Sequence, residues 1–565
     1  MDEREDFQSI MPFLPLFLRS SSLFWQPAVA EFLKCLAKGP LHSKVNSGES
    51  FAAAISDMRK EFRLSPLHPS ASLGFSRFFD SLMKADASER WFADVVPGLA
   101  DLLLKLPVLL ENHYRNGSIC NGKETGLRLL ESQQSGIVVM SQELIAALLA
   151  CAFFCLYPTR NRGSQHLQPI NFDHLFLSLY EHDKVHQEHK IKCILHYFER
   201  ICSDMPTGNV SFERKVLPFK NCQSNIVYPG TDFWSNSTKS LCQLEVHNSG
   251  LIEDHCSEAL EVDFANKYLG GGALGQGCVQ EEIRFMINPE LIIGILFSPA
   301  MEDNEAIEVV GAERFSNYSG YAASFRFCGD YVDEKSFDTM GRRKTRIVAI
   351  DALIHPGKRQ YKSECLLRES NKAFCGFFNQ QKANLLMKGE DFGPKHDMII
   401  EEGPSTSGHN ILTEDLSDSI QGYKRTTSCD TVEKKGNKVD QYSIYEDDGI
   451  GVATGNWGCG AFGGDPEVKV VIQWLAASQA LRPFMLYYTF GLSSLQKLEE
   501  VAQWILSQGW TVGELWNILV EYSTQRFKGE TTLGLFNWLL PSLYADDPIL
   551  GAPSLRSKIL SFFCR

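Results

Sequence analysis

The spacing of apolar residues divides the chain into two regions. From about residue 1 to 205, apolar residues recur at three- and four-residue intervals, most clearly over 91–110, 141–157 and 189–202. This period is that of helices with one buried face. From about residue 206 onward, short β-branched and aromatic runs alternate with helical stretches. The pattern therefore predicts a helical first region followed by an α/β layered region.

Within the second region, the clearest strand signals cover 260–264, 307–310, 347–354 and 484–490. The segment 388–448 is rich in Ser, Thr, Asp, Lys and Gly and has little periodicity, which predicts a disordered insertion. After residue 491 the chain becomes helical and aromatic again. We therefore expect an α/β domain with C-terminal helices packed on it.

Composition narrows the class of protein. With 565 residues, 44% of them hydrophobic, the chain can form a large core and should contain more than one structural unit. The longest apolar run, 144–157, is shorter than the about 20 residues that span a bilayer, so no membrane segment is predicted. The first six residues are acidic, unlike a signal peptide, and we expect a protein that is not secreted.

Charge and cysteine usage exclude two further classes. The sixteen cysteines form no CxxC pair and show no ligand spacing, so we expect reduced thiols and no zinc site. The formal net charge of −14 argues against a general nucleic-acid binder, and no direct DNA binding is expected. A polyanionic ligand would have to be held by local backbone N–H groups and a few side chains.

The segment 270–282 joins a glycine-rich loop to two adjacent carboxylates, Glu281 and Glu282. Such loops can wrap phosphate, whereas the glutamates suit a sugar hydroxyl or a glycosidic oxygen, where a carboxylic acid can donate a proton. The alternative is a surface turn whose glutamates begin a helix. Neighbours in a helix diverge by about 100°, so one glutamate is expected to donate a proton and the other to orient the sugar.

A second glycine cluster covers 455–464, with five glycines in ten positions. Asp465 is a good N-cap, Pro466 suits the first helical position, and an apolar stripe follows. A glycine-rich loop that leads into a helix N-terminus is suited to bind an anion, and we expect this one to bind a diphosphate. A tight crossover that needs small residues is the alternative.

Together these residues resemble the motifs of the poly(ADP-ribose) glycohydrolase family, a glycine triplet followed by Gln-Glu-Glu. The resemblance extends over 261–266, 281–285, 318–321 and 455–465, covers most of 206–525, and is strongest to plant members. It implies a macrodomain-like α/β/α mixed sheet (206–525), an all-helical N-terminal accessory domain (1–205) and a C-terminal helical extension (526–565). It also implies release of ADP-ribose from poly(ADP-ribose) on modified proteins, without metal or cofactor.

The resemblance also implies roles for particular residues. Glu282 matches the acid that protonates the ribose oxygen leaving from the α(1″→2′) bond, Glu281 the carboxylate that positions the ribose, and Asp263 a supporting acid. The substrate-binding positions that it implies are the glycine triplet Gly270, Gly271 and Gly272; the ribose contacts Asn266 and Gln280; the adenine pair Ile252 and Glu253; the covering aromatic Tyr321; the diphosphate loop Asn456, Trp457, Gly458, Cys459, Gly460 and Ala461; and the aromatic walls Phe462 and Phe490.

Several of these residues also have ordinary structural explanations. Asp263 could cap a turn, Asn266 could be a turn residue, and Tyr321 and Phe490 could be core aromatics. Two other functions also stay open: an ADP-ribose-binding macrodomain without activity, and a dinucleotide-dependent oxidoreductase, because the first glycine loop fits G-x-G-x-x-G. The basic run 341–346 could be a nuclear import signal or a solvated lead-in to a strand. We expect a monomer of the nucleus or cytoplasm, with a role in the DNA damage response.

Overall fold

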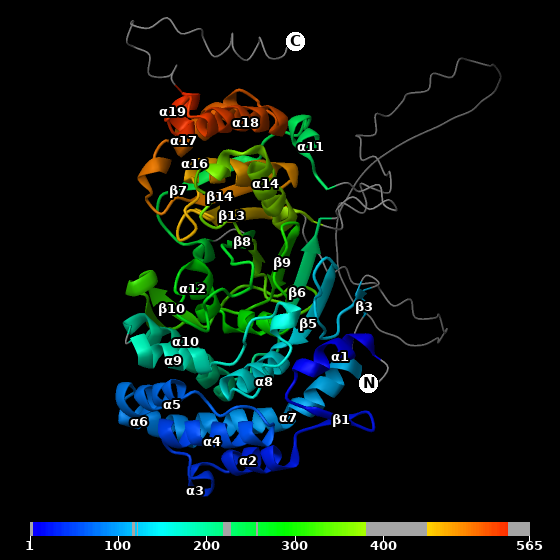
Figure 1. The fold of residues 1–565 in the computed structure, drawn as a ribbon, viewed down its shortest axis with the longest axis vertical. Coiled ribbons are helices and arrows are strands. Elements are labelled where there is room, and N and C mark those ends of the chain that lie inside the picture. Colours follow the sequence, from blue (N-terminus) through cyan, green and yellow to red (C-terminus); the bar gives the residue numbers. More distant parts are fainter. Residues whose placement is uncertain are drawn as a thin grey trace, which may run out of the picture. The chain divides into compact units, whose positions relative to one another are not determined.

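A computed structural model describes residues 4–115, 119–120, 123–182, 184–217, 228–255, 258–379 and 449–540. The elements in these ranges belong to one compact unit (Figure 1). The predicted insertion at 388–448 lies outside the described residues, and the predicted C-terminal extension is described only as far as residue 540.

An eight-stranded mixed sheet forms the centre of the described structure. Its order is β5 (Gly136–Ser141), β6 (Asn209–Val216), β9 (Glu305–Val310), β12 (Arg346–Ala349), β8 (Ala259–Asp263), β13 (Gly451–Gly455), β14 (Phe484–Tyr488) and β7 (Gln243–His247). Strands β12, β8, β13, β14 and β7 are parallel to one another, whereas β9, β6 and β5 continue the sheet in antiparallel pairs. The four strands predicted from the sequence are all present, with shifted ends.

Helices cover both faces of this sheet. On one face lie α14 (Ser363–Phe377) and α16 (Pro466–Gln479), with α11 (Thr231–Ser235), α17 (Leu498–Ser507), α18 (Val512–Lys528) and α19 (Leu535–Leu539) (Figure 1). On the other face lie α12 (Gln280–Ile287), α13 (Gly294–Phe297), α8 (Gln142–Phe153) and α10 (Val185–Ser203). The predicted α/β/α arrangement is confirmed.

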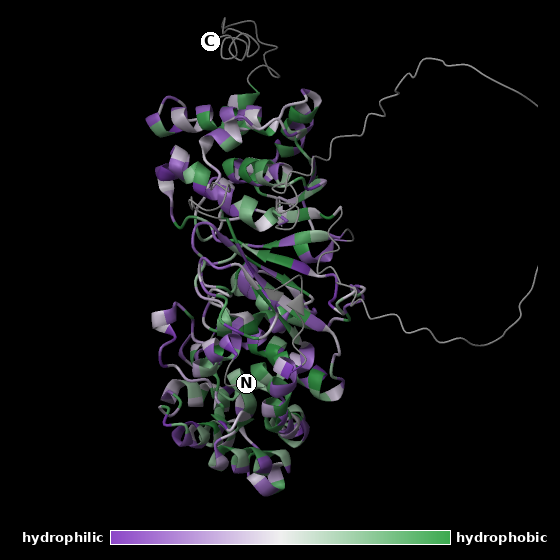
Figure 2. Cartoon of the chain, turned by 90° about the vertical axis from the view of Figure 1, so that its right-hand side faces the viewer, coloured by the Kyte–Doolittle hydropathy of each residue, from purple (hydrophilic) through white to green (hydrophobic). Residues whose placement is uncertain are grey.

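Alternation along the strands explains the two layers. In β12, Val348 packs in the core with α14 and α16, whereas Ile347 and Ala349 pack in the core formed with the N-terminal helices. Successive side chains of a strand point to opposite faces, so one short strand serves both cores. Figure 2 shows hydrophobic residues gathered in these central strands.

The N-terminal region is mainly helical, as predicted. Besides α8 and α10 it contains α1 (Glu5–Ile10), α2 (Pro27–Ala37), α3 (Pro40–Ser43), α4 (Gly48–Glu61), α5 (Pro69–Ser76), α6 (Ala85–Arg90), α7 (Val96–Arg115) and α9 (Asp173–His182). Within the described ranges, no helix combines the length and the apolar character needed to cross a membrane.

The expectation of an entirely helical first region was wrong in one respect. It contains the short pairs β1 (Phe17–Arg19) with β2 (Ser22–Phe24) and β3 (Ile119–Cys120) with β4 (Lys123–Glu124), and β5 becomes an edge strand of the central sheet. Strand β5 is a short apolar run directly before α8, so its signal merges with that of the helix. The N-terminal helices and one sheet face therefore share a continuous core.

Candidate active site

Strand β8 carries two carboxylates on the face that meets α12. Leu260 and Val262 point into the core with α14 and α16, so the alternation turns Glu261 and Asp263 to the opposite face. Glu261 forms ion pairs with Arg284 of α12 and with Lys335, at 2.7 Å from its ammonium nitrogen. These cations lower the pKa of Glu261 to about 2 in spite of its burial. Glu261 therefore joins β8 to α12 as an ionised structural group.

Asp263 has no such partner. It is 1% exposed, and neither of its carboxylate oxygens accepts a hydrogen bond from the part of the chain that the structure describes. Burial, with the nearby Glu282 adding to it, raises the pKa of Asp263 to about 8, although Arg284 opposes the shift. Asp263 thus favours its protonated form near neutral pH.

Gln280, the first residue of α12, fixes the helix to the end of β8. Its side-chain oxygen accepts from the Phe264 N–H at 2.8 Å, and its amide nitrogen donates to the Val262 carbonyl at 3.1 Å. This clamp places the first turn of α12, and with it Glu281 and Glu282, beside Asp263. Helix α12 thus begins at Gln280, and both glutamates lie in its first turn.

Each glutamate is held by two backbone N–H groups. Glu281 accepts from Asn266 at 2.9 Å and from Gly270 at 2.7 Å. Glu282 accepts from Gly272 at 2.9 Å and from Val279 at 2.8 Å. The N–H groups of Gly270 and Gly272 therefore bind the glutamates and are not open to a phosphate, so the phosphate-wrapping interpretation was wrong for these two groups. The oxidoreductase alternative is disfavoured for the same reason, because its G-x-G-x-x-G loop would have to offer these N–H groups to a pyrophosphate.

Glycine is required in this loop because the carboxylates fill the space beside the backbone. Gly271 has φ +48°, and a Cβ there would lie 2.4 Å from Glu281 Oε2 and 2.7 Å from Glu282 Oε1. At Gly277 a Cβ would lie 2.6 Å from the carboxyl carbon of Glu282. The loop is thus a close-fitting support for both glutamates.

The carboxylates of Asp263, Glu281 and Glu282 form one electrostatic cluster. Burial raises the pKa of Glu281 well above its ordinary value, and the charges of Asp263 and Glu282 raise it further. A cluster of this kind holds a proton near neutral pH, which is what a general acid requires. Glu282 is 6% exposed, compared with 2% for Glu281 and 1% for Asp263, so Glu282 is the member that a ligand can best reach.

The second glycine loop lies at the end of β13, the strand next to β8. Asp465 caps α16 by accepting from the Glu467 N–H at 3.0 Å, and Pro466 takes the first position, as predicted. The N–H groups of Gly458, Gly460 and Ala461 donate no hydrogen bond within the described part of the chain. The loop therefore offers backbone donors at a helix N-terminus, which suits an anion.

Two side chains of this loop form hydrogen bonds with other parts of the structure. Trp457 is fully buried, with its indole N–H donating to the Ile350 carbonyl at 2.9 Å. Asn456 donates to the Thr489 carbonyl at 3.0 Å and accepts from the Tyr487 hydroxyl at 3.1 Å. The indole of Trp457 is therefore part of the core, and its backbone N–H donates to the Gly455 carbonyl at 2.7 Å. The side chain of Asn456 joins the ends of β13 and β14. Of the remaining loop residues, Cys459 and Phe462 are half-buried.

The other predicted positions surround the same ends of the strands. Ile252 packs with Ala453 and Tyr488 on the face that carries Asp263, and Glu253 accepts from the Tyr318 hydroxyl at 2.5 Å. Tyr321 is 54% exposed. Partial burial against α12 still raises its pKa; the charge of Glu282 also raises it, whereas the Gln280 N–H lowers it.

The last two predicted positions are Phe490, an exposed aromatic, and Asn266, a turn residue. Phe490 is 46% exposed at φ +52°, and a Cβ on Gly455 would lie 2.9 Å from its ring. It therefore stands over the end of β13 as an exposed aromatic. The side chain of Asn266 accepts from the Tyr268 N–H at 3.1 Å, so the turn role considered for it is correct.

Sequence reasoning missed Lys190. This residue of α10 is fully buried, and its ammonium group donates to the carbonyl oxygens of Gly275 at 2.8 Å and Gly277 at 2.6 Å. The sequence did carry a signal for Lys190. It lies four residues before Ile194, on the apolar face of the helix, where a lysine is uncommon.

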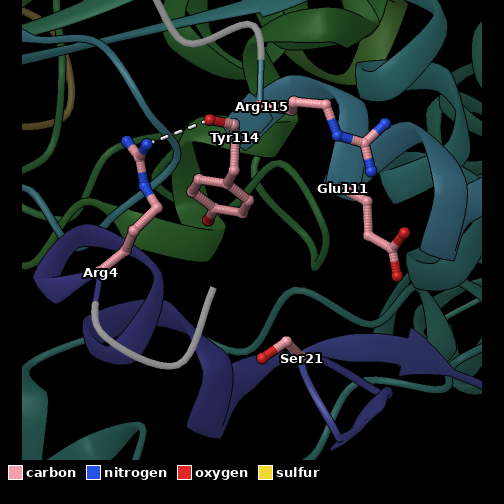
Figure 3. Close-up of a pocket in the computed structure, with 5 residues that line it drawn as sticks. All are labelled: Arg4, Ser21, Glu111, Tyr114 and Arg115. Carbon is pink, nitrogen blue, oxygen red and sulfur yellow. Dashed lines mark hydrogen bonds between the residues drawn. The ribbon is translucent and has the colours of Figure 1, made fainter.

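A pocket of about 270 Å³ lies elsewhere, in the N-terminal region (Figure 3). Its lining consists of Arg4, Ser21, Glu111, Tyr114 and Arg115, none of which is a predicted site residue. Arg4 and Glu111 already hold backbone groups, the Tyr114 carbonyl at 3.1 Å and the Leu23 N–H at 2.7 Å. We assign the candidate site to the carboxylate cluster, because that is where buried acids with raised pKa values lie together.

The mixed sheet with helices on both faces is a macrodomain-like fold, and three buried carboxylates lie beside its glycine-rich loop. Residues 231–497 match the macro domain fold of the poly(ADP-ribose) glycohydrolase (PARG) family, and residues 83–214 match its helical domain. The chain belongs to the poly(ADP-ribose) glycohydrolase family and is a glycosidase.

Individual relatives agree with this assignment. The chain is 54% identical to poly(ADP-ribose) glycohydrolase 1 of Arabidopsis thaliana over 98% of its own length and 100% of the relative. It is 50% identical to the probable poly(ADP-ribose) glycohydrolase 2 of the same plant, over 96% of the chain and 100% of the relative. Poly(ADP-ribose) glycohydrolase 1 of Caenorhabditis elegans is 27% identical over 74% of this chain and 47% of the worm protein. The plant-type resemblance is confirmed.

Proposed function

We propose that this chain hydrolyses the α(1″→2′) ribose–ribose bonds of poly(ADP-ribose) and releases ADP-ribose. The observation that carries the proposal is the buried cluster of Asp263, Glu281 and Glu282 at the end of β8, in which the pKa values of Asp263 and Glu281 are raised. The choice of substrate is supported by the names of the similar plant proteins and by the near full-length similarity to them.

In this mechanism Glu282 is the general acid. It donates a proton to the ribose 2′-oxygen as the bond from C1″ to that oxygen breaks, and a water molecule adds its oxygen to C1″. The proton released by the water returns to Glu282, which completes the cycle. Asp263 and Glu281, whose pKa values are raised, hold protons beside Glu282. Glu281 also positions the ribose.

The remaining positions would bind one ADP-ribose unit. The N–H groups of Gly458, Gly460 and Ala461 would hold the diphosphate, and Ile252 with Glu253 would meet the adenine. Tyr321 and Phe490, both exposed aromatics near the strand ends, would cover the sugars. We also propose a monomer in the nucleus or cytoplasm, which size-exclusion chromatography and cell fractionation would test.

The test is Glu282→Gln, with Glu334→Gln on the surface as the matched control. The amide keeps the shape but cannot donate the proton, so we expect kcat on poly(ADP-ribose) to fall by about 10² to 10⁴ while ADP-ribose affinity is nearly unchanged. Wild-type activity in the Glu282 variant would remove this residue from the mechanism. Binding of ADP-ribose without any release from polymer by the wild-type chain would instead identify a reader domain.

A further inference from the structure

The ammonium group of Lys190 lies against the glycine loop that carries the site, although α10 comes from the N-terminal helical region. It donates to the carbonyls of Gly275 at 2.8 Å and Gly277 at 2.6 Å, with a longer contact of 3.4 Å to Gly272. An ammonium has three N–H donors, so these three carbonyls account for all of them. Lys190 thus fastens the middle of the loop from one side.

Glu282 is held from the other side of the same loop. The N–H of Gly272 donates to one of its oxygens and the N–H of Val279 to the other, at 2.9 and 2.8 Å. The carbonyl of Gly272 faces Lys190 while its N–H faces Glu282. A shift of the loop would therefore move the two donors that aim this carboxylate.

We propose that Lys190 is a positioning residue for Glu282, because its hold on the three carbonyls keeps the N–H groups of Gly272 and Val279 directed at the glutamate. The catalytic consequence rests on the proposed function, whereas the hold on the loop does not. The helical region thereby contributes directly to the geometry of the site.

The cost of burying a lysine supports a specific role. A fully buried ammonium loses its hydration, and an apolar side chain would fill the same helix face without that cost. Cys278 and Glu282 are the ionisable groups that act on it, and burial lowers its pKa to about 8, so it is still a cation at neutral pH. Glu282 in turn faces Asp263, Glu281, Tyr321 and Cys278.

The experiment compares Lys190→Met, which keeps the length of the side chain, with Lys192→Met. Lys192 lies on the same helix but pairs with Glu188 at the surface. We measure kcat on poly(ADP-ribose), the dissociation constant of ADP-ribose, and amide hydrogen exchange. For Lys190→Met we expect kcat to fall about 10- to 100-fold, since small misplacements of catalytic groups cost that much, with ADP-ribose affinity within about threefold.

Hydrogen exchange separates positioning from general destabilisation. Exchange should accelerate over 270–280 but not over 456–464, and Lys192→Met should change neither. A kcat within about twofold of wild type, or equal acceleration in both loops, would overturn the proposal.

If Lys190→Met does not fold, Lys190→Arg and Lys190→Gln replace it. Arginine keeps a cation with several donors and should retain more activity than glutamine, whereas equal activity of the two would contradict the proposal. If the wild-type chain releases no ADP-ribose, the proposed function fails, but the exchange comparison still decides whether Lys190 holds the loop.

Discussion

Replacing Asp263 by Asn should make the protein more stable, and the gain should grow with pH. The folded pKa of Asp263 is about 8, against an ordinary value of 3.8, because the carboxyl is buried near other acids. Between these values the folded protein keeps a proton that the unfolded chain releases. Stability of the wild type therefore falls as pH rises through this window, and below it the titration of Asp263 adds no pH dependence. Asparagine does not titrate, so the stability of the variant lacks this dependence on pH.

The size of the effect follows from the same numbers. One proton taken up on folding corresponds to about 1.4 kcal/mol per pH unit. From pH 5 to pH 8 the difference in stability between the two proteins therefore changes by at most about 4 kcal/mol. Glu281 and Glu282 share the charge of the cluster, which makes this figure an upper bound.

The assay is chemical or thermal unfolding of both proteins in parallel at pH 5, 6, 7 and 8. Glu261→Gln on the same strand is the matched control. The pKa of Glu261 is lowered to about 2, so its stabilising contribution is complete above pH 4.5 and is lost only as pH falls below that. Its variant should be destabilised by a constant amount across the range. A pH-independent difference for Asp263→Asn, or lower stability at pH 8, would refute the reasoning.

Three further predictions concern the loops and the substrate. Gly277→Ala should lower kcat about 10- to 100-fold by displacing the carboxyl of Glu282, whereas Gly163→Ala, where a Cβ meets nothing, should not; equal rates in the two variants would contradict this. Deleting 395–440 should leave folding and turnover nearly unchanged, and loss of soluble protein would show that the segment is structural. The enzyme should shorten chains to ADP-ribose but leave the last protein-bound unit, because its leaving group differs; quantitative removal of mono(ADP-ribose) from a modified protein would contradict this specificity.

Local chemistry made several features readable from the sequence. Asp465 followed by Pro466 predicted the start of α16, because capping depends on a few neighbouring residues. The pair Glu281 and Glu282 after a glycine loop indicated sugar chemistry, which stays a prediction. Alternating and helical periods predicted the layered fold, since each period reflects which face of one element is buried.

The partners of each group were decided only by tertiary structure. The sequence could not show that Gly270 and Gly272 direct their N–H groups at glutamates, because that depends on where α12 docks against β8. Nor could it place Trp457 in the core or Lys190 beneath the loop, since both contacts join segments far apart in the chain. A sequence determines which residues can do chemistry and which faces are buried. Burial depth, long-range hydrogen bonds and the proximity of like charges set the pKa values, and these arise only when the elements pack.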